Sequence, residues 1–193
     1  MRASASVAGV PPLSPPDPPL TDGVVTLRGF RDTDAGAIEV MMEDAEIARW
    51  TRAPSPYRLR DAVEWLSTHA TLMRRRSEMP LAIVDAEDEE LLGSISLRLG
   101  ADARGEFGYA VARWARGQGF GTRALRLYAR YAFDALRLER LEVFIRPENE
   151  ASLALAEAVG FQEEGLLRSH AVVRDRRVDM VVLGMLPGEL IEE

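Results

Sequence analysis

The sequence of 193 residues contains no cysteine, no lysine and only two histidines. Without cysteine, the chain has no disulfide, no thiolate metal ligand and no thiol nucleophile. Two histidines do not suffice for a multi-histidine metal site, so we expect no bound metal. All 24 basic residues are arginine. The absence of lysine excludes a Walker A phosphate loop and Schiff-base catalysis.

Long hydrophobic runs are missing as well. No stretch reaches the roughly 18 apolar residues that a membrane-spanning helix needs. The apolar run at residues 7–10 is shorter than the core of a secretory signal, about 7–15 residues. The net charge of −7 argues against a broad basic face for nucleic acid and suits cationic partners such as amines. We therefore expect a cytoplasmic protein that binds neither membranes nor nucleic acid.

The first 20 residues differ in composition from the rest of the chain. Six of the eleven prolines lie between Pro11 and Pro19, and the segment carries almost no charge. Such a composition favours extended polyproline geometry over a packed core. We predict a disordered or surface-draped leader at residues 1–20 and a single domain at 21–193. The alternative is that the leader is a ligand for a proline-recognition domain.

The apolar pattern beyond the leader predicts alternating strands and helices. Strands are expected near residues 24–27, 81–84, 91–99, 105–112, 141–145, 161–173 and 177–186. Helices are expected after residues 32–33, over 59–75, from 121 to about 136, and after Asn149. This order predicts a mixed α/β fold, with one mostly antiparallel central sheet of about seven strands flanked by about four helices.

The segment Arg116–Gly121, with the sequence RGQGFG, joins an expected strand to an expected helix. Its glycines let the backbone approach a bulky anion closely. The free N–H groups and the dipole at the start of the helix attract that anion, and Arg116 can add positive charge. The pattern predicts a pyrophosphate-binding loop. A glycine-rich turn without a ligand is the alternative.

A dinucleotide is one candidate for the pyrophosphate ligand. Gly117 and Gly119 fit the G-x-G-x-x-G/A fingerprint, but its third glycine position is Thr122. An acidic residue about 20 positions further on is present as Glu139 or Glu142. The motif, however, lies in the middle of the chain, after a hairpin-rich half. That position makes a nicotinamide dinucleotide site the weaker alternative.

Arg116–Gly121 matches every fixed position of the coenzyme A loop R/Q-x-x-G-x-G/A, and the chain here resembles the GCN5-related N-acetyltransferases (GNAT). The resemblance covers about residues 24–187. Asn149–Ser152 and Gly160-Phe161 are similar to the next landmark of that family. The ending, Gly165–His170 followed by Arg177–Met180, resembles the RimJ/RimL branch of ribosomal-protein N-terminal acetyltransferases and their relatives.

The resemblance implies the GNAT fold and transfer of acetyl from acetyl-CoA to a primary amine by direct attack. The implied coenzyme-binding residues are Ala110, Val111, Ala112, Arg116, Gly117, Gln118, Gly119, Phe120, Gly121, Thr122, Asn149 and Ser152. Backbone N–H groups near Ala110–Ala112 would face the thioester carbonyl as an oxyanion hole. Asn149 would bind the pantetheine arm, and Ser152 would lie near the sulfur.

The general acid and the general base follow less directly. Many family members carry a tyrosine four residues after the serine of the Asn-x-x-Ser motif. That position is Ala156 here, so Ser152 is the candidate acid. The amine must lose a proton before it attacks, and Glu106 on the strand before the loop is the first candidate base. Glu106 could equally pair with an arginine in a structural role.

Other titratable and aromatic residues remain open in role. Asp179 is a second candidate base, with a structural role as the alternative. His170 and Asp179 are also candidates for binding the acceptor, although packing would explain His170 as well. His69 lies on an apolar helix stripe typical of a core residue. Trp50 and Tyr57 are expected to border the acceptor pocket or to pack.

The acceptor is an amine that the sequence does not identify, either a protein N-terminus or a small molecule. The acyl group could also be succinyl. A noncatalytic acyl-CoA-binding module is the alternative to an enzyme, and the resemblance is compatible with a homodimer.

Overall fold

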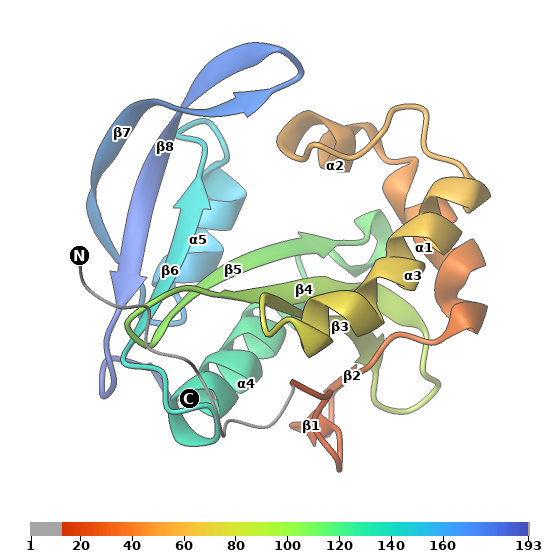
Figure 1. Ribbon diagram of the computed structural model, residues 1–193, viewed down its shortest axis with the longest axis horizontal. Helices are drawn as coiled ribbons and strands as arrows, with labels where there is room; N and C mark the ends of the chain where they lie inside the picture. The colour runs from red at the N-terminus through yellow and green to blue at the C-terminus, as the bar shows by residue number, and fades with distance from the viewer. Residues whose placement is uncertain (1–12, 193) are drawn as a thin grey trace.

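An eight-stranded sheet forms the centre of the protein in the computed structural model, which describes residues 13–192 (Figure 1). Its strand order is β1-β2-β3-β4-β5-β6-β8-β7, and every neighbouring pair is antiparallel except β5 and β6. The strands are β1 (Leu20–Thr21), β2 (Val25–Arg28), β3 (Glu78–Asp85), β4 (Leu91–Leu99), β5 (Arg104–Val111), β6 (Arg140–Ile145), β7 (Gln162–Val173) and β8 (Arg176–Met185).

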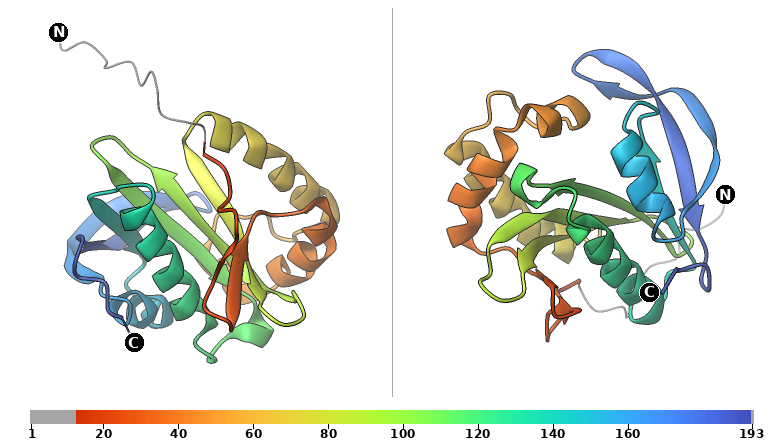
Figure 2. Two further views of the ribbon diagram at one scale, coloured as in Figure 1. Left: turned by 90° about the horizontal axis from the view of Figure 1, so that it is seen from below. Right: turned by 180° about the vertical axis from the view of Figure 1, so that it is seen from behind.

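Helices cover both faces of this sheet (Figure 2). They are α1 (Ala35–Met42), α2 (Ala45–Trp50), α3 (Leu59–Arg74), α4 (Phe120–Asp134) and α5 (Glu150–Glu157). Helices α1–α3 lie on one side of the sheet, and α4 and α5 lie on the other. Short 3₁₀ turns span Asp32–Asp34 and Arg113–Ala115. None of the helices in the described part of the chain is long and apolar enough to cross a membrane.

The predicted mixed, mostly antiparallel α/β fold is confirmed, with eight strands where seven were expected. The additional strand, β1, has two residues and lies at the end of the predicted leader. The additional helix, α2, has six residues and follows α1 after a break at Glu43 and Asp44. Elements this short carry too few residues for a period to show in the sequence.

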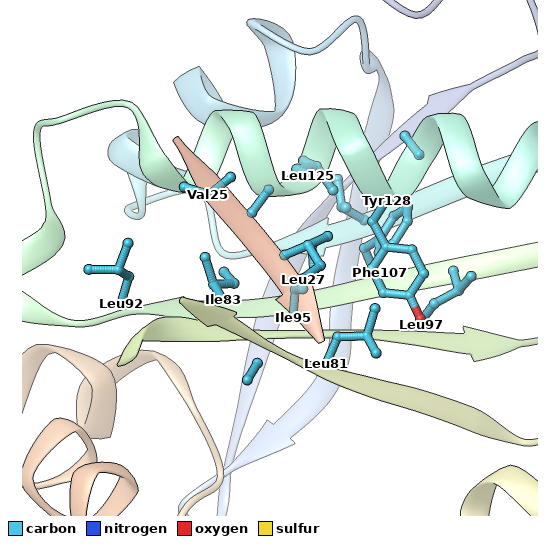
Figure 3. Packing of buried hydrophobic residues seen from close by; sticks show 14 of the residues in the cluster. Val25, Leu27, Leu81, Ile83, Leu92, Ile95, Leu97, Phe107, Leu125 and Tyr128 are labelled. Atoms are coloured by element: carbon cyan, nitrogen blue, oxygen red, sulfur yellow. The ribbon is translucent and has the colours of Figure 1, made fainter. Parts of the chain in front are cut away.

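The main hydrophobic core lies between α4 and the sheet (Figure 3). Alternate residues of β3 and β4, such as Leu81 and Ile95, point toward Leu125 and Tyr128 of α4, and all four are at most 1% exposed. Burying each such side chain stabilises the fold by about 1.5–3 kcal/mol. Tyr128 also donates a hydrogen bond to the carbonyl of Met79 (2.7 Å), so its hydroxyl is satisfied inside the core.

The end of the predicted leader packs against the domain. Leu13 is 7% exposed and belongs to the hydrophobic core, and Pro16 is buried. Pro15 lies so close to Gly29 that a Cβ on Gly29 would approach its ring within 2.8 Å. Leu13–Pro16 therefore lie against the domain, and Leu20 pairs with β2 as part of β1. Residues 1–12 of the predicted leader lie outside the described residues.

Strands β5 and β6 separate part-way along their length, as Figure 1 shows. They pair in parallel from Arg104↔Arg140 to Phe107↔Val143. Beyond that point β5 remains paired with β4 as far as Val111, and β6 remains paired with β8 as far as Ile145. The facing edges of β5 and β6 are thus unpaired with each other at one end of the sheet, and this gap positions the candidate site.

Candidate active site

A cavity of about 860 Å³ opens at the gap between β5 and β6. Its walls come from helices α1, α2 and α3, from the strands around the gap and from the β7–β8 hairpin. It brings together these predicted site residues: Trp50, Tyr57, Glu106, Ala110, Asn149, Ser152 and His170. Asp179 and the loop at Arg116–Thr122 do not line it.

Small side chains form the floor of the cavity. Ser94 is paired with Ala110, and Ser96 with Gly108, across the antiparallel β4–β5 ladder. Residues directly opposite each other in such a ladder point to the same face of the sheet. The four positions leave space above the strands because none of them carries a long side chain.

Glu106 lies in the cavity and is paired with an arginine. Arg98, directly opposite on β4, places Nη1 2.5 Å from Glu106 Oε1, and its Nε lies 3.7 Å from Glu78 Oε2. Both features foreseen for Glu106, a place in the site and an ion pair, are therefore present together. This ion pair would have to rearrange if the carboxylate accepted a substrate proton.

The glycine-rich loop leads into α4. The first N–H groups of α4 have no acceptor within the helix. Gly119 is the N-cap and offers no side chain, and the first intrahelical hydrogen bond runs from Arg123 N to Gly119 O (3.0 Å). Gly117 and Gly119 have φ of +71° and +80°, and no atom lies within 4 Å of where a Cβ would stand on either. Backbone conformation, rather than crowding, requires these two glycines. The arrangement is suited to an anion.

Gly121 serves a different purpose from the other two glycines. A Cβ there would approach Leu155 of α5 within 2.7 Å and Val111 of β5 within 3.0 Å. Gly121 therefore lets the start of α4 pack closely against the end of β5 and against α5.

Arg116 links the loop to helix α2. Its Nη2 lies 2.5 Å from Asp44 Oδ2, and its Nε donates to the carbonyl of Val111 (3.1 Å). Asp44 is also the N-cap of α2, because its Oδ1 accepts from the N–H of Glu46 (3.0 Å). The charge expected to face a ligand is thus partly neutralised by Asp44.

Backbone donors face the gap at alternate residues of β5. The N–H of Ala112 donates to Leu92 O (2.8 Å), so it is not available to a ligand. Because the N–H groups of an antiparallel strand alternate in direction, that of Ala110 also points to β4. Those of Tyr109 and Val111 point toward the gap. Of the three expected oxyanion donors, Val111 is the one whose N–H faces it.

Tyr109 and Ser152 form a pair of hydroxyl groups across the gap. Their oxygens are 2.9 Å apart, and Tyr109 Oη also lies 3.2 Å from the carbonyl oxygen of Ser152. Burial raises the pKa of Tyr109 to about 12, although the hydrogen bond to Ser152 acts in the opposite direction. Tyr109 therefore remains protonated near neutral pH. Tyr109 was not among the predicted site residues, although it lies on β5, the strand that precedes the glycine-rich loop.

Asn149 fixes the start of α5. Its Oδ1 accepts from the N–H of Ser152 (3.3 Å), which caps the helix and orients the first turn toward the gap. Ala156, where many family members carry tyrosine, is fully buried and contributes no polar group.

The opposite wall of the cavity is aromatic and cationic. The indole N–H of Trp50 donates to Glu46 Oε2 (3.1 Å), and the guanidinium carbons of Arg49 and Arg146 lie 4.4 Å and 5.0 Å from the centre of its ring. Tyr57 is 5% exposed, and its burial raises the pKa of the hydroxyl. Arg146 is a second cavity residue that sequence reasoning missed.

His170 and Asp179 lie near each other on the β7–β8 hairpin but have different surroundings. His170 stacks on Phe144 with ring centres 5.1 Å apart and an interplanar angle of 8°. Asp179 Oδ1 accepts from the N–H of Ser169 (2.7 Å), where β7 is irregular and φ is +53°. Asp179 thus shapes the strand beside His170.

His69 is a core residue, as expected. It is 7% exposed and packs against Phe30 and Trp65. Burial lowers its pKa to about 4, so the ring is neutral at physiological pH.

Residues 25–162 match the acetyltransferase (GNAT) domain family. The chain belongs to the GNAT family. Two relatives, both bearing the name uncharacterized N-acetyltransferase, are similar over most of their length. Protein p20 of Bacillus licheniformis is 26% identical over 167 residues, 86% of this chain and 94% of the relative. YoaA of Bacillus subtilis (strain 168) is 30% identical over 152 residues, 78% of this chain and 85% of the relative.

A solved structure of RimJ from Mycobacterium smegmatis, in complex with CoA-disulfide, is also similar to the GNAT chain. The two structures superpose with a TM-score of 0.80 at 28% sequence identity, and the match covers 89% of this chain and 86% of the RimJ chain. The predicted resemblance to the RimJ/RimL branch is confirmed, and the chain is an N-acetyltransferase of the GNAT type.

Proposed function

We propose that the protein transfers an acetyl group from acetyl-CoA to a primary amine by direct attack. The observation that carries this proposal is the gap between β5 and β6, with the uncapped start of α4 on one side and the cavity on the other. The complex of the related RimJ with CoA-disulfide supports a coenzyme A substrate. The acceptor amine would be a protein N-terminus or a small molecule.

In this proposal the coenzyme lies along the gap. The N–H groups of residues 120–122 at the start of α4 would bind the pyrophosphate. The pantetheine arm would run beside β5, within reach of the N–H groups of Tyr109 and Val111, and toward Asn149. The acceptor would enter through the cavity on the α1–α3 side.

The reaction would proceed through a tetrahedral intermediate. The lone pair of the neutral amine forms a C–N bond to the thioester carbon, and the oxyanion is stabilised by the N–H of Val111. The C–S bond then breaks and releases the coenzyme A thiolate. The amine proton passes to a base, for which Glu106 and His170 line the cavity. The Tyr109–Ser152 pair would supply a proton to the sulfur, with solvent restoring it.

Calorimetry with acetyl-CoA tests this placement through Gly119→Val. A valine at φ +80° is strained and would project where the pyrophosphate is expected, so affinity should fall by at least roughly tenfold. Gly23→Val is the matched control, because Gly23 has φ +85° and similarly open surroundings outside the site. Unchanged affinity in a folded Gly119→Val variant would overturn the placement, and tight binding of NAD would favour a dinucleotide site instead.

A further inference from the structure

Arg146 occupies a distinctive position at the end of β6. It directly follows Ile145, on the portion of the strand that has separated from β5, and three residues before Asn149. Its guanidinium group lies over the ring of Trp50, which belongs to α2 on the far wall. Arg146 therefore stands between the expected coenzyme site and the acceptor wall.

The hydrogen-bonding capacity of Arg146 is only partly used. Its side chain is 23% exposed, and its Nε is buried without a hydrogen-bond partner among the described residues. Its Nη2 lies 3.3 Å from Glu148 Oε2, but the side chain of Glu148 is 59% exposed. An ion pair with such an exposed partner is weak. A buried guanidinium N–H without a partner favours binding of an oxygen acceptor there.

The other charged residues of the cavity do not neutralise Arg146. Arg98 is matched by Glu106 at the far end of the floor. Asp61 accepts from the backbone N–H of Arg58 and lies on α3, as does the exposed Glu64. Arg52, two residues after Trp50, has no ion pair or hydrogen bond within the described part of the chain. Glu46, which contacts Trp50, is itself paired with Arg49. Arg52 and Arg146 therefore leave an excess of positive charge on the Trp50 side of the cavity.

We infer that the acceptor carries a carboxylate close to its amine and that Arg146 binds this carboxylate. The inference rests on the proposed function, which it deepens by naming the substrate class. A guanidinium group offers planar N–H donors that match a carboxylate or a phosphate. Bound in this way, the anionic group would hold the neighbouring amine at the gap. The positive charge of Arg146 would also favour the neutral, reactive form of the amine.

The test compares three peptides that differ in one side chain: alanyl-aspartyl-alanine amide, its asparaginyl isostere and its phosphoseryl counterpart. Binding is measured by calorimetry, with and without saturating coenzyme A, and acetylation is measured as kcat/KM. We expect the aspartyl peptide to bind at least roughly tenfold more tightly than the asparaginyl peptide, from one charge-assisted contact. A preference for the phosphoseryl peptide would support the same anion site with a phosphate as its source.

Arg146→Gln should abolish the aspartyl preference, measured as the ratio of the affinities for the aspartyl and asparaginyl peptides. Arg146→Lys keeps the positive charge and should retain part of the aspartyl preference, which distinguishes loss of the charge from a folding defect. Arg75→Gln removes the same charge from an exposed side chain at the end of α3, outside the cavity, and should have no effect. Equal binding of all three peptides overturns the inference, as does a preference that survives Arg146→Gln. The titrations without coenzyme measure the peptide preference independently of coenzyme binding. Failure of acetyl-CoA to bind would therefore contradict the proposed function and not this inference.

Discussion

In the proposed mechanism, Tyr109 of strand β5 would supply the hydroxyl that Ala156 of α5 does not provide. Its pairing with Ser152 at 2.9 Å joins two hydroxyls that are 43 positions apart in the sequence. Because burial raises the pKa of Tyr109 to about 12, the group remains protonated and can donate. The pair would therefore be able to donate a proton to a thiolate that leaves into the gap.

Tyr109→Phe should lower kcat by up to roughly 10²-fold, at the lower end of the usual range for general-acid help. Coenzyme affinity should change little, since the ring is retained. If both hydroxyls act as one unit, adding Ser152→Ala should cause little further loss. Tyr131→Phe, outside the cavity, is the control. A steady-state assay that finds normal kcat in Tyr109→Phe removes the pair from the mechanism.

Glu106 is tested by Glu106→Gln in a pH–rate profile. If the carboxylate takes the amine proton, kcat should fall by roughly 10²–10⁴-fold near pH 7. The loss should shrink as pH rises, because more of the amine is then already neutral.

Glu78→Gln is the matched control for Glu106→Gln, since Glu78 also contacts Arg98 but does not line the cavity. A purely structural Glu106 predicts lower thermal stability and a rate loss that is independent of pH. Near-normal kcat across pH 6–9 would leave His170 as the leading base.

At the residue scale, site residues that belong to one local motif could be predicted from the sequence. Residues whose role depends on a contact between two elements could not. Gly117 and Gly119 could be recognised because their spacing is local and their backbone conformation demands glycine. Tyr109 and Arg146 could not, because their roles depend on Ser152 and Trp50, which come from other elements. The direction of each N–H on β5 also depends on the register with β4, which the sequence does not specify.

At the scale of elements, the separation of β5 from β6 determines where chemistry can occur. The apolar pattern predicted a strand near residues 91–99, and the structure has β4 there. The end of the β5–β6 pairing at Phe107 was not derivable from apolar periodicity. Beyond that point each strand is held by a partner elsewhere in the chain, β5 by β4 and β6 by β8.

The irregular β7 near His170 depends on one carboxylate. Asp179→Ala removes the acceptor for the N–H of Ser169 and should lower the free energy of unfolding by about 1–2 kcal/mol. The KM for the acceptor should rise because His170 lines the cavity, whereas coenzyme affinity should stay the same.

Chemical denaturation and steady-state kinetics measure both effects of Asp179→Ala. Asp175→Ala, at the exposed tip of the same hairpin, is the control. A large loss of kcat that recovers at high pH, without loss of stability, would instead make Asp179 a base.

At the scale of the whole molecule, the proposed coenzyme site and the proposed acceptor site involve helices on opposite sides of the sheet. The start of α4 and the first turn of α5 lie on one side, and α2, which carries Trp50, lies on the other (Figure 2). The overall fold could be predicted because most strands and helices between residues 24 and 187 are long enough for their apolar periodicity to show in the sequence. The packing of residues 13–20 could not, since proline-rich composition does not show that Leu13 has a site in the core.

Truncation separates the two parts of the N-terminal segment. Leu13→Ala should lower the free energy of unfolding by about 2–3 kcal/mol, whereas Ser14→Ala, which is exposed, should have little effect. Deleting residues 1–19 should destabilise the protein at least as much as Leu13→Ala, and deleting 1–12 should leave the melting temperature nearly unchanged. Equal melting temperatures for both deletions would contradict the packing of Leu13.

Product analysis with isotopically labelled acetyl-CoA and a mixture of primary amines tests the central claim most directly. Mass spectrometry should show the labelled acetyl group on an amine, with one coenzyme A released per product and no acetylated protein as an intermediate. Gly119→Val should suppress both products, and Gly23→Val should not. Tight binding of acetyl-CoA with no acetylated amine and no coenzyme A release would contradict the claim and indicate a noncatalytic acyl-CoA-binding module.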